Sequence, residues 1–128
     1  MVRKKQFERI MQYIVDEYDV SPEYLWTRYP DFAVFRHPNS NKWFGLIMNV
    51  PAHQLGQPGD DAIRCINLHL EPRLVATLID DAHFIPGYHM NKNSWVTIFL
   101  NDGLTDNQIK PLIRASYDSV APVRIRRA

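Results

Sequence analysis

One stretch in the second half of the chain combines two large aromatic rings, an imidazole, an amide and a cation, namely Tyr88, His89, Asn91, Lys92 and Trp95. Aromatic rings beside a cation are the groups that base stacking combined with phosphate contact requires. In that interpretation Lys92 contacts phosphate, Asn91 and His89 make polar contacts, and the rings stack on bases or position them. The same composition also fits a packing role, in which both rings and the neighbouring Met90 enter the core while Asn91 and Lys92 only form a turn.

A second candidate lies at the tip of a predicted hairpin, where polar and basic residues precede two aromatic ones. These residues are Arg36, His37, Asn39, Asn41, Lys42, Trp43 and Phe44. Arg36 and Lys42 are the cations from which we expect further phosphate contacts. A charged hairpin tip is also typical of a turn that is simply solvated, so the pattern alone leaves both interpretations open.

No pattern in the sequence is typical of a catalytic centre. The five histidines are scattered, and none belongs to a His-Glu-x-x-His motif. The nucleophile motif Gly-x-Ser-x-Gly does not occur. Cys65, the single cysteine, lies in a predicted strand, where a small buried thiol is more common than a reactive thiolate. We therefore expect a protein that is not an enzyme and has no cofactor, although folding could still bring histidines and carboxylates together around a metal.

Composition limits the class of protein. Hydrophobic residues make up 45% and charged residues 23% of the 128 residues, as in an ordinary globular domain. The net charge is only +1 and the pI about 7.9, whereas nucleic-acid-binding domains more often have a pI above about 9. Basic surface must therefore be local, for example at the basic ends, residues 1–9 and 122–128. The single cysteine and the lack of an apolar signal core at the start predict a cytoplasmic protein without a membrane contact.

Hydrophobic periodicity predicts a single α+β domain in the order helix, three strands, helix, one or two strands, helix, with a mainly antiparallel sheet and helices packed on it. Apolar residues at three- and four-residue spacing predict a first helix from Phe7 to Tyr18. Strands are expected at 32–37, 42–50, 62–70 and 94–101, and an extended arm or loop at 84–93. Pro72 predicts the start of a second helix, and a capping box of Thr105 with Gln108 predicts the start of a third.

In these elements the sequence resembles the MmcQ/YjbR family of small bacterial proteins. The resemblance rests on Phe35-Arg36-His37 followed by Lys42 to Ile47, on Leu70-Glu71-Pro72, on Tyr88 to Lys92 followed by Trp95 to Ile98, and on Ser116-Tyr117. It runs from about residue 5 to about residue 120 of one domain spanning residues 1–128, with a basic tail at 122–128.

The resemblance implies a compact α-β-β-β-α-β-β-α domain, with a fold similar to that of frataxin-like CyaY proteins and of secretion chaperones. It also implies binding of DNA through a double-wing motif, in which the wings are β-hairpins. Many relatives have a histidine just before the tryptophan, where this chain has Ser94, so a role of that histidine does not carry over.

Our leading hypothesis is a DNA-binding protein that makes weak, local electrostatic contact through its hairpins. The residues expected at the contact are Tyr88, His89, Asn91, Lys92, Trp95, Arg36 and Lys42. The alternative is a chaperone-like module that binds a protein or peptide, as a monomer or weak dimer, because an aromatic-rich and nearly neutral chain suits contact with another protein. A third and weaker hypothesis is a metal carrier that uses the carboxylate pairs Asp60-Asp61 and Asp80-Asp81.

Overall fold

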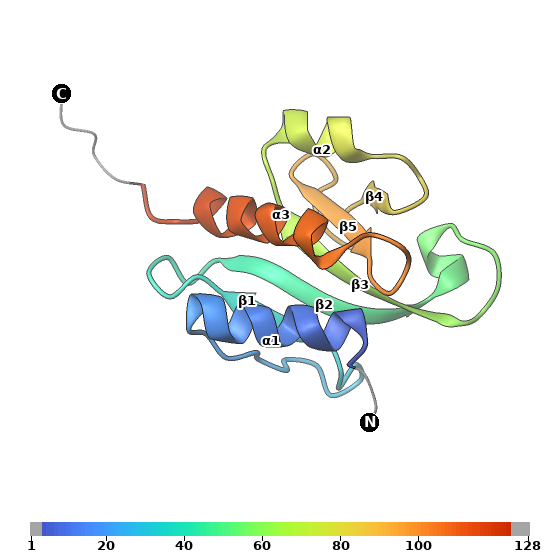
Figure 1. The fold of residues 1–128 in the computed structure, drawn as a ribbon, viewed down its shortest axis with the longest axis horizontal. Coiled ribbons are helices and arrows are strands. Elements are labelled where there is room, and N and C mark those ends of the chain that lie inside the picture. The colour runs from blue at the N-terminus through green and yellow to red at the C-terminus, as the bar shows by residue number, and fades with distance from the viewer. Residues whose placement is uncertain (1–3, 124–128) are drawn as a thin grey trace.

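A computed structural model describes residues 4–123 of the chain, and Figure 1 shows how their elements are arranged. Five strands form one antiparallel sheet in the order β1-β2-β3-β5-β4. The strands are β1 (Ala33–Arg36), β2 (Trp43–Pro51), β3 (Ala62–His69), β4 (Phe84–Pro86) and β5 (Trp95–Phe99). A single hairpin turn joins β4 to β5, so that β5 pairs with β3 and β4 takes the edge of the sheet.

The described residues form three α-helices, α1 (Gln6–Tyr18), α2 (Pro72–Leu78) and α3 (Asp106–Ser119), and a short 3-10 helix, η1 (Ala52–Leu55), after β2. Proline begins α2, where its missing N–H would have no partner within the helix. The predicted capping box begins α3: the Gln108 N–H donates to the Thr105 hydroxyl (3.2 Å), and the Thr105 N–H donates to the Gln108 side chain (2.8 Å). These local signals set the helix boundaries.

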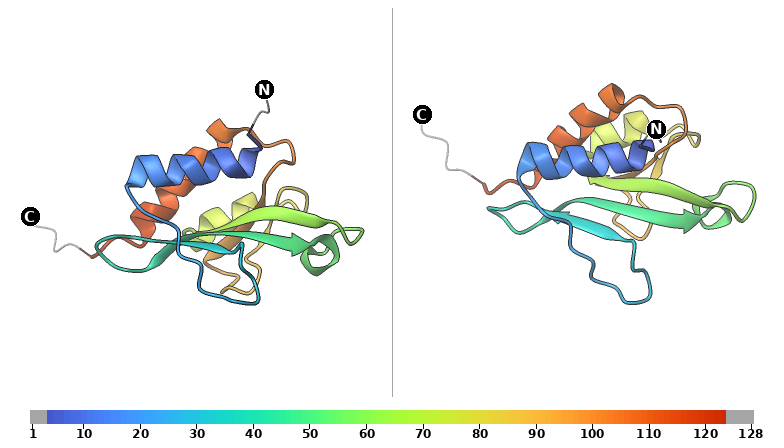
Figure 2. Two further views of the ribbon diagram at one scale, coloured as in Figure 1. Left: turned by 90° about the horizontal axis from the view of Figure 1, so that it is seen from below. Right: turned by 60° about the horizontal axis from the view of Figure 1, so that its bottom comes forward.

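All three α-helices lie on one face of the sheet, as Figure 2 shows. The main core of the protein fills the space between them and the strands. Its fully buried members include Ile10 and Ile14 of α1, Phe44 and Ile98 of the sheet, and Ile113 of α3. Their three- and four-residue spacing in the helices is the one that the sequence predicts.

The opposite face of the sheet, here called the open face, is crossed by segments without helical structure. The chain between α1 and β1 (residues 19–32) and the turn between β4 and β5 (residues 87–94) both extend below the sheet in Figure 2. A second core cluster lies here, with Met48, Cys65 and Phe99 buried and Trp26 and Tyr88 partly buried around them. The open face is therefore covered by aromatic side chains of loops.

A buried serine joins α3 to the middle of the sheet. The Ser116 hydroxyl, which is 0% exposed, donates to the Phe44 carbonyl of β2 (2.5 Å) and accepts the His69 N–H of β3 (2.9 Å). It thereby satisfies one main-chain acceptor and one main-chain donor at the point where the β2–β3 pairing ends. Ser116 is thus part of the framework that holds this end of both strands.

A polar cluster joins α1 to the start of α3. The Arg9 guanidinium donates to both carboxylate oxygens of Asp106 (2.8 and 3.0 Å), and the Gln6 side chain donates to Asp106 (3.0 Å) and to the Leu104 carbonyl (2.6 Å). These donors lower the pKa of Asp106 to about 2, with the hydrogen bond from Arg9 as the main cause.

The predicted order of elements is confirmed, as is the α+β class with its antiparallel sheet. The segment expected to be an extended arm or loop in fact begins as strand β4, and only the part after Pro86 is a turn.

The basic ends lie mostly outside the described residues, which exclude Arg3, Arg124, Arg126 and Arg127. Between residues 4 and 123, no helix has both the length and the apolar character needed to cross a membrane.

Candidate functional site

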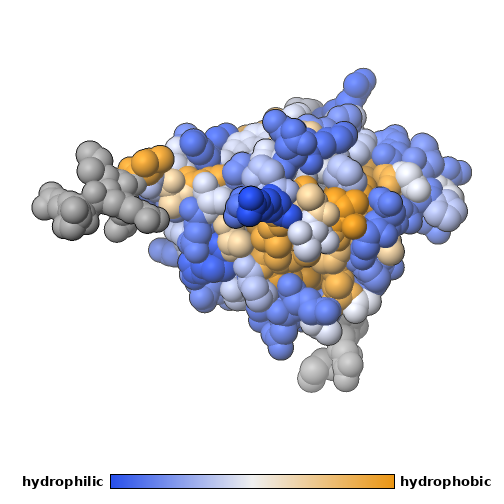
Figure 3. All heavy atoms as spheres, turned by 90° about the horizontal axis from the view of Figure 1, so that it is seen from above, coloured by the Kyte–Doolittle hydropathy of each residue, from blue (hydrophilic) through white to orange (hydrophobic). Residues whose placement is uncertain are grey.

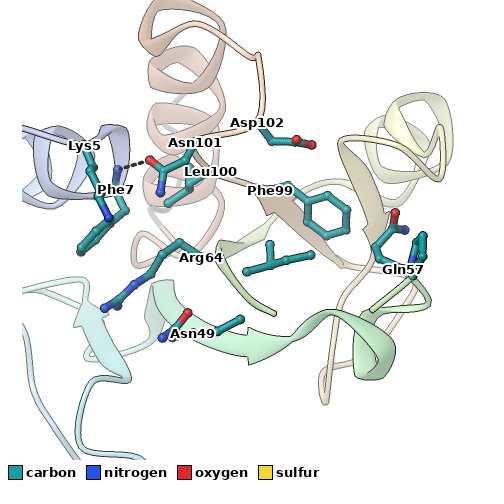
Figure 4. A pocket seen from close by; sticks show the side chains of 12 residues that line it. Lys5, Phe7, Asn49, Gln57, Arg64, Phe99, Leu100, Asn101 and Asp102 are labelled. Carbon is teal, nitrogen blue, oxygen red and sulfur yellow. Dashed lines mark hydrogen bonds between the residues drawn. The ribbon is translucent and has the colours of Figure 1, made fainter. Parts of the chain in front are cut away.

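A polar cavity of about 630 Å³ lies where the ends of β2 and β3 approach the start of α1 (Figure 4). Lys5, Arg64 and Asp102 stand at separate parts of its rim and do not converge on a common point. Arg64 lies over the ring of Phe7, 4.1 Å from its centroid, and the Asn101 side chain accepts the Phe7 N–H (3.2 Å). Polar groups of this cavity therefore serve mainly to attach α1 to the sheet.

A smaller cavity of about 270 Å³, here called the aromatic cleft, opens on the open face. Three segments that are distant in sequence form it: residues 19–32, strand β2 and the β4–β5 turn. Its lining residues are Trp26, Tyr29, Phe32, Trp43, Leu46, Met48, Tyr88, His89 and Met90. The lining is almost entirely aromatic or aliphatic, so the cleft suits a flat or apolar group.

The aromatic rings of the cleft support one another. Trp26 stands perpendicular to Trp43, with 5.8 Å between centroids and 90° between planes, and nearly perpendicular to Phe32, at 5.9 Å and 77°. Tyr29 stacks on Phe32 at 4.8 Å while 47% of Tyr29 remains exposed. Edge-to-face and offset-stacked pairs are the favourable arrangements of aromatic rings. The walls of the cleft are therefore already formed without a ligand.

Backbone pairing fixes the segment that carries Trp26 and Tyr29. Glu23 and Val34 exchange two main-chain hydrogen bonds of 2.9 Å, which extend the sheet by one isolated bridge beyond β1. The Glu23 carboxylate also accepts a 2.8 Å hydrogen bond from Arg36. Residues 19–32 are thus paired with β1 near their start, through Glu23, and continue directly into β1 at their end.

The β4–β5 turn is fixed by a buried polar network. Asn67 and Thr97 face each other on β3 and β5, and the Thr97 hydroxyl donates to the Asn67 side chain (2.5 Å). Asn67 also donates to the Tyr88 carbonyl (3.0 Å), and the Tyr88 N–H donates to Thr97 (2.8 Å). Since Asn67 and Thr97 are fully buried, these bonds place the Tyr88 ring firmly at one end of the cleft.

Gly87 lets this turn lie directly on β5. A Cβ atom on Gly87 would come within 2.6 Å of the Trp95 Cβ and 3.0 Å of the Trp95 carbonyl oxygen. The Gly87 N–H donates to that same oxygen (2.9 Å). The next ring after Tyr88 belongs to His89, which has a left-handed backbone (φ 59°) and lies 4.0 Å from the Tyr88 ring between centroids.

Cations flank the aromatic cleft at both ends. Arg36 lies over the Trp43 ring at 5.8 Å, but its charge is paired with Glu23. Lys42, which directly precedes Trp43, is exposed. At the other end the Lys92 ammonium donates to the Gly87 carbonyl (2.8 Å), and Lys92 lines a neighbouring cavity together with Tyr88. The end near Tyr88 therefore has a cation that forms no ion pair among the described residues, whereas the cation at the Trp43 end is paired with a carboxylate.

Two of the predicted contact residues lie away from the cleft. Trp95 packs edge-on against His69, 5.3 Å between centroids, and the His69 ring is hydrogen-bonded to Ser119 of α3 (2.8 Å). The Asn91 side chain accepts the Asn93 N–H (2.9 Å), which makes it a turn-forming residue although it is exposed. Trp95 thus has chiefly a packing position, while Asn91 has a conformational one.

Burial shifts the pKa values of ionisable groups on both faces of the sheet: Cys65 and Tyr88 belong to the open face, whereas His37 and His69 contact α3. It raises the pKa of Cys65 to about 12 and raises the pKa of Tyr88. It also lowers the pKa of His69, with nearby Lys42 as a second cause, and lowers the pKa of His37. Cys65 is therefore a core residue and not a reactive thiolate.

The structure brings together only part of the set that the sequence predicts. Tyr88 and His89 line the cleft, and Arg36 and Lys92 lie near its ends. Lys42 lies instead on the side of the sheet where His69 bonds Ser119 of α3. Sequence reasoning missed the other wall, which is formed by Trp26, Tyr29 and Phe32. The sequence signal that could have indicated this wall is the concentration of aromatic residues between 24 and 32. These aromatic residues do not have the spacing of a helix that packs on a core.

Metal-binding geometry is absent from residues 4–123, where no group of three or more histidine, cysteine, aspartate or glutamate side chains could hold an ion. Asp80 instead accepts the main-chain N–H groups of Ala82, His83 and Phe84 at 2.8–2.9 Å. These hydrogen bonds lower its pKa to about 2. Asp80 is thus a turn-capping residue.

Comparison with known proteins gives consistent matches over most of the chain. The model of a family described as YjbR matches residues 16–119. An uncharacterised protein of Bacillus subtilis (strain 168), YyaQ, is 37% identical over 110 residues, which cover 86% of this chain and 93% of the relative. A crystal structure of a Pseudomonas syringae protein has a TM-score of 0.85 and 37% identity, and the match covers 94% of this chain and 99% of that one. A Deinococcus radiodurans protein (TM-score 0.65, 21% identity, 91% of this chain and 78% of that one) shares the fold alone.

Proposed function

This chain belongs to the YjbR family, and on that premise we propose that it is a non-catalytic nucleic-acid-binding protein whose contact surface is the open face of the sheet. The observation that carries the proposal is the aromatic cleft with Lys92 beside one end and Arg36 over the Trp43 ring at the other. Aromatic surface for bases and cations for phosphates are the two components of nucleic-acid binding by a sheet face.

Two hairpins supply the cations in this proposal. The β4–β5 turn carries Lys92, and the β1–β2 hairpin carries Arg36. Lys92 takes part in none of the ion pairs that join the described residues, so it is available for phosphate. Arg36 contributes less, because Glu23 already neutralises it, and Lys42 lies on the side of His69 and α3.

The electrostatic contribution is expected to be small. The net charge of the chain is +1, and the paired arginines reduce the number of free cations further. With about three phosphates neutralised, the slope of log affinity against log salt is roughly −2.7 for duplex DNA and −2.1 for a single strand. Binding should therefore be weak and best observed at low salt.

The test is a titration of labelled oligonucleotides, followed by fluorescence anisotropy at several salt concentrations. We expect Lys92→Gln to weaken binding and to reduce the salt slope by about 0.7–0.9 per lost phosphate contact. Lys110→Gln is the matched control, because Lys110 lies on the helix side, 4.8 Å from the Tyr13 ring centroid. No binding of single strands or duplex at micromolar protein in low salt would refute the proposal.

A second candidate function, binding of a protein partner, is favoured by the surface over α2. Figure 3, which views the molecule from the α2 side, shows apolar side chains gathered near the centre of that face. Partly buried apolar residues of α2 and of the chain after it, such as Leu74, Leu78 and Ile79, pack against the helix-side core. Contiguous apolar surface is typical of protein contacts. A monomer at all accessible concentrations in analytical ultracentrifugation, with no captured partner, would count against this candidate.

A further inference from the structure

We propose that the aromatic cleft receives one unpaired base of a single-stranded nucleic acid. This inference rests on the proposed function, and it goes further by naming the form of nucleic acid and the place where a base is held. Its starting point is the shape of the cleft. A volume of about 270 Å³ is just below the range of roughly 300–1,000 Å³ for drug-sized ligands, so the cleft suits a single ring system better than a large molecule.

The walls of the cleft provide aromatic rings on which one face of a base can stack. Leu46 and Met48 of β2 lie at the sheet, while Trp26, Trp43 and Tyr88 stand around them. Because Trp26 and Trp43 are already held at right angles to each other, a base that stacks on one ring meets the edge of the other. Stacking on aromatic rings holds bases of any sequence, since every base has a π-face.

Polar groups adjoin the cleft on the side where the edge of a base would emerge. A hollow of about 80 Å³ shares Tyr29, Phe32, Tyr88 and His89 with the cleft and adds polar residues Asn49 and Gln54. The Tyr88 hydroxyl donates to the Gln54 side-chain oxygen (2.8 Å), which leaves the Gln54 amide N–H groups as donors. Amide and imidazole groups can bond the edges of unpaired bases, which is how single strands are commonly recognised.

The charge distribution fits a strand that crosses the cleft. Arg36, which is paired with Glu23, lies over Trp43 at one end, and Lys92 stands beside Tyr88 at the other. A phosphate on either side of a bound nucleotide would thus meet a cation. The lining between these ends is apolar, so a phosphate is not favoured inside the cleft.

A paired base could not occupy this position. Bases of a duplex are stacked inside it, and bringing one out requires unstacking and unpairing that cost a few kcal/mol. The modest positive charge of this chain offers little electrostatic energy to offset that cost. We therefore expect single strands to bind more tightly than duplexes of the same sequence.

The experiment compares three labelled probes at one low salt concentration. The probes are oligothymidine of about 8 nucleotides, an abasic strand of the same length, and a duplex. A length of about 8 nucleotides lies within the known site sizes of single-strand-binding proteins. We expect the strand with bases to bind about 5- to 150-fold more tightly than the abasic strand, the range that one stacked base provides. The abasic strand keeps every phosphate, so the difference reports on the bases alone and needs no protein variant.

Tryptophan fluorescence then locates the base. Trp26 and Trp43 line the cleft and Trp95 does not, so quenching by oligothymidine should persist in Trp95→Phe and vanish in the double variant Trp26→Phe, Trp43→Phe. Trp43→Leu, which keeps an apolar side chain but removes the ring, should bind oligothymidine only as tightly as the abasic strand, and its circular dichroism shows whether the fold is kept.

Equal affinity for the abasic strand and for oligothymidine would overturn the inference while leaving nucleic-acid binding intact. Preference for the duplex would overturn it in the same way. Failure of all three probes to bind would instead refute the proposed function as well, and quenching by an apolar peptide alone would assign the cleft to a protein partner.

Discussion

Replacing Gly87 by alanine tests whether close contact between the β4–β5 turn and β5 builds the site. The new Cβ atom would lie 2.6 Å from the Trp95 Cβ and 3.1 Å from the Trp95 carbonyl carbon. Neither neighbour can rotate away, so the turn and the strand must separate. Overpacking costs about 1–3 kcal/mol, and the weakened hydrogen bond from the Gly87 N–H to the Trp95 carbonyl adds about 0.5–1.5 kcal/mol. We expect a loss of about 2–4 kcal/mol in the free energy of unfolding.

Gly45→Ala is the matched control in the same sheet. Gly45 is also buried, but its Cβ would meet the Phe35 ring at 3.6 Å, an ordinary contact. Its free energy of unfolding should stay within about 0.5 kcal/mol of the wild-type value. Urea unfolding followed by circular dichroism measures both variants, and Gly87→Ala should lower Tm by roughly 6–20 °C. Equal stability of the two variants would show that the turn tolerates displacement, and the argument that Gly87 positions Tyr88 and Lys92 would fail.

Three further predictions concern the framework around the site. Ser116→Ala removes the hydroxyl that bonds main-chain groups of β2 and β3 and should lower the free energy of unfolding in urea by about 2–4 kcal/mol. The control Ser21→Ala, at an exposed position, should change the free energy of unfolding little. A loss below about 0.5 kcal/mol in Ser116→Ala would contradict the role of Ser116. Asp106→Asn should cost about 1–2 kcal/mol at pH 7, allowing for solvent screening of the pair with Arg9. Because the folded pKa of Asp106 is lowered to about 2, this difference should be constant above about pH 4 and disappear toward pH 2, and a difference that does not vary with pH would refute the charge pairing. Cys65, with a pKa raised to about 12 by burial, should react with iodoacetamide at pH 8 only after unfolding, and rapid labelling of the native protein would contradict its core position.

The elements were predictable because their signals are local. The spacing of Ile10 and Ile14 and the pairing of Thr105 with Gln108 depend on residues within one helical turn. The exception is β4, a three-residue strand whose sequence carries too few positions to show an alternating pattern. Its pairing with β5 was set by the turn at Gly87 and not by its own composition.

The candidate site was predictable only in part. Tyr88 and Lys92 were marked by unusual local composition, and the structure places both at one end of the aromatic cleft. Trp95 looked equally suited to stacking, but alternation along β5 and its pairing with His69 place its ring against that histidine. Arg36 looked like a free cation, but Glu23, thirteen residues earlier, neutralises it. Composition shows which charged and aromatic side chains a segment contains, but it does not show whether another residue of the chain already pairs with them.

The fold class, the order of the elements and the family can be predicted from local signals, because periodicity, caps and short motifs involve residues that are close along the chain. The cleft of Trp26, Trp43 and Tyr88 cannot be predicted in this way, because these residues meet only in the folded chain. They meet because the strand order β1-β2-β3-β5-β4 places β2, which begins with Trp43, between β1 and the β4–β5 pair. Residues 19–32, which carry Trp26 and run into β1, must also cross the open face. No local pattern specifies either feature, since both follow from how the whole chain buries its apolar surface at once.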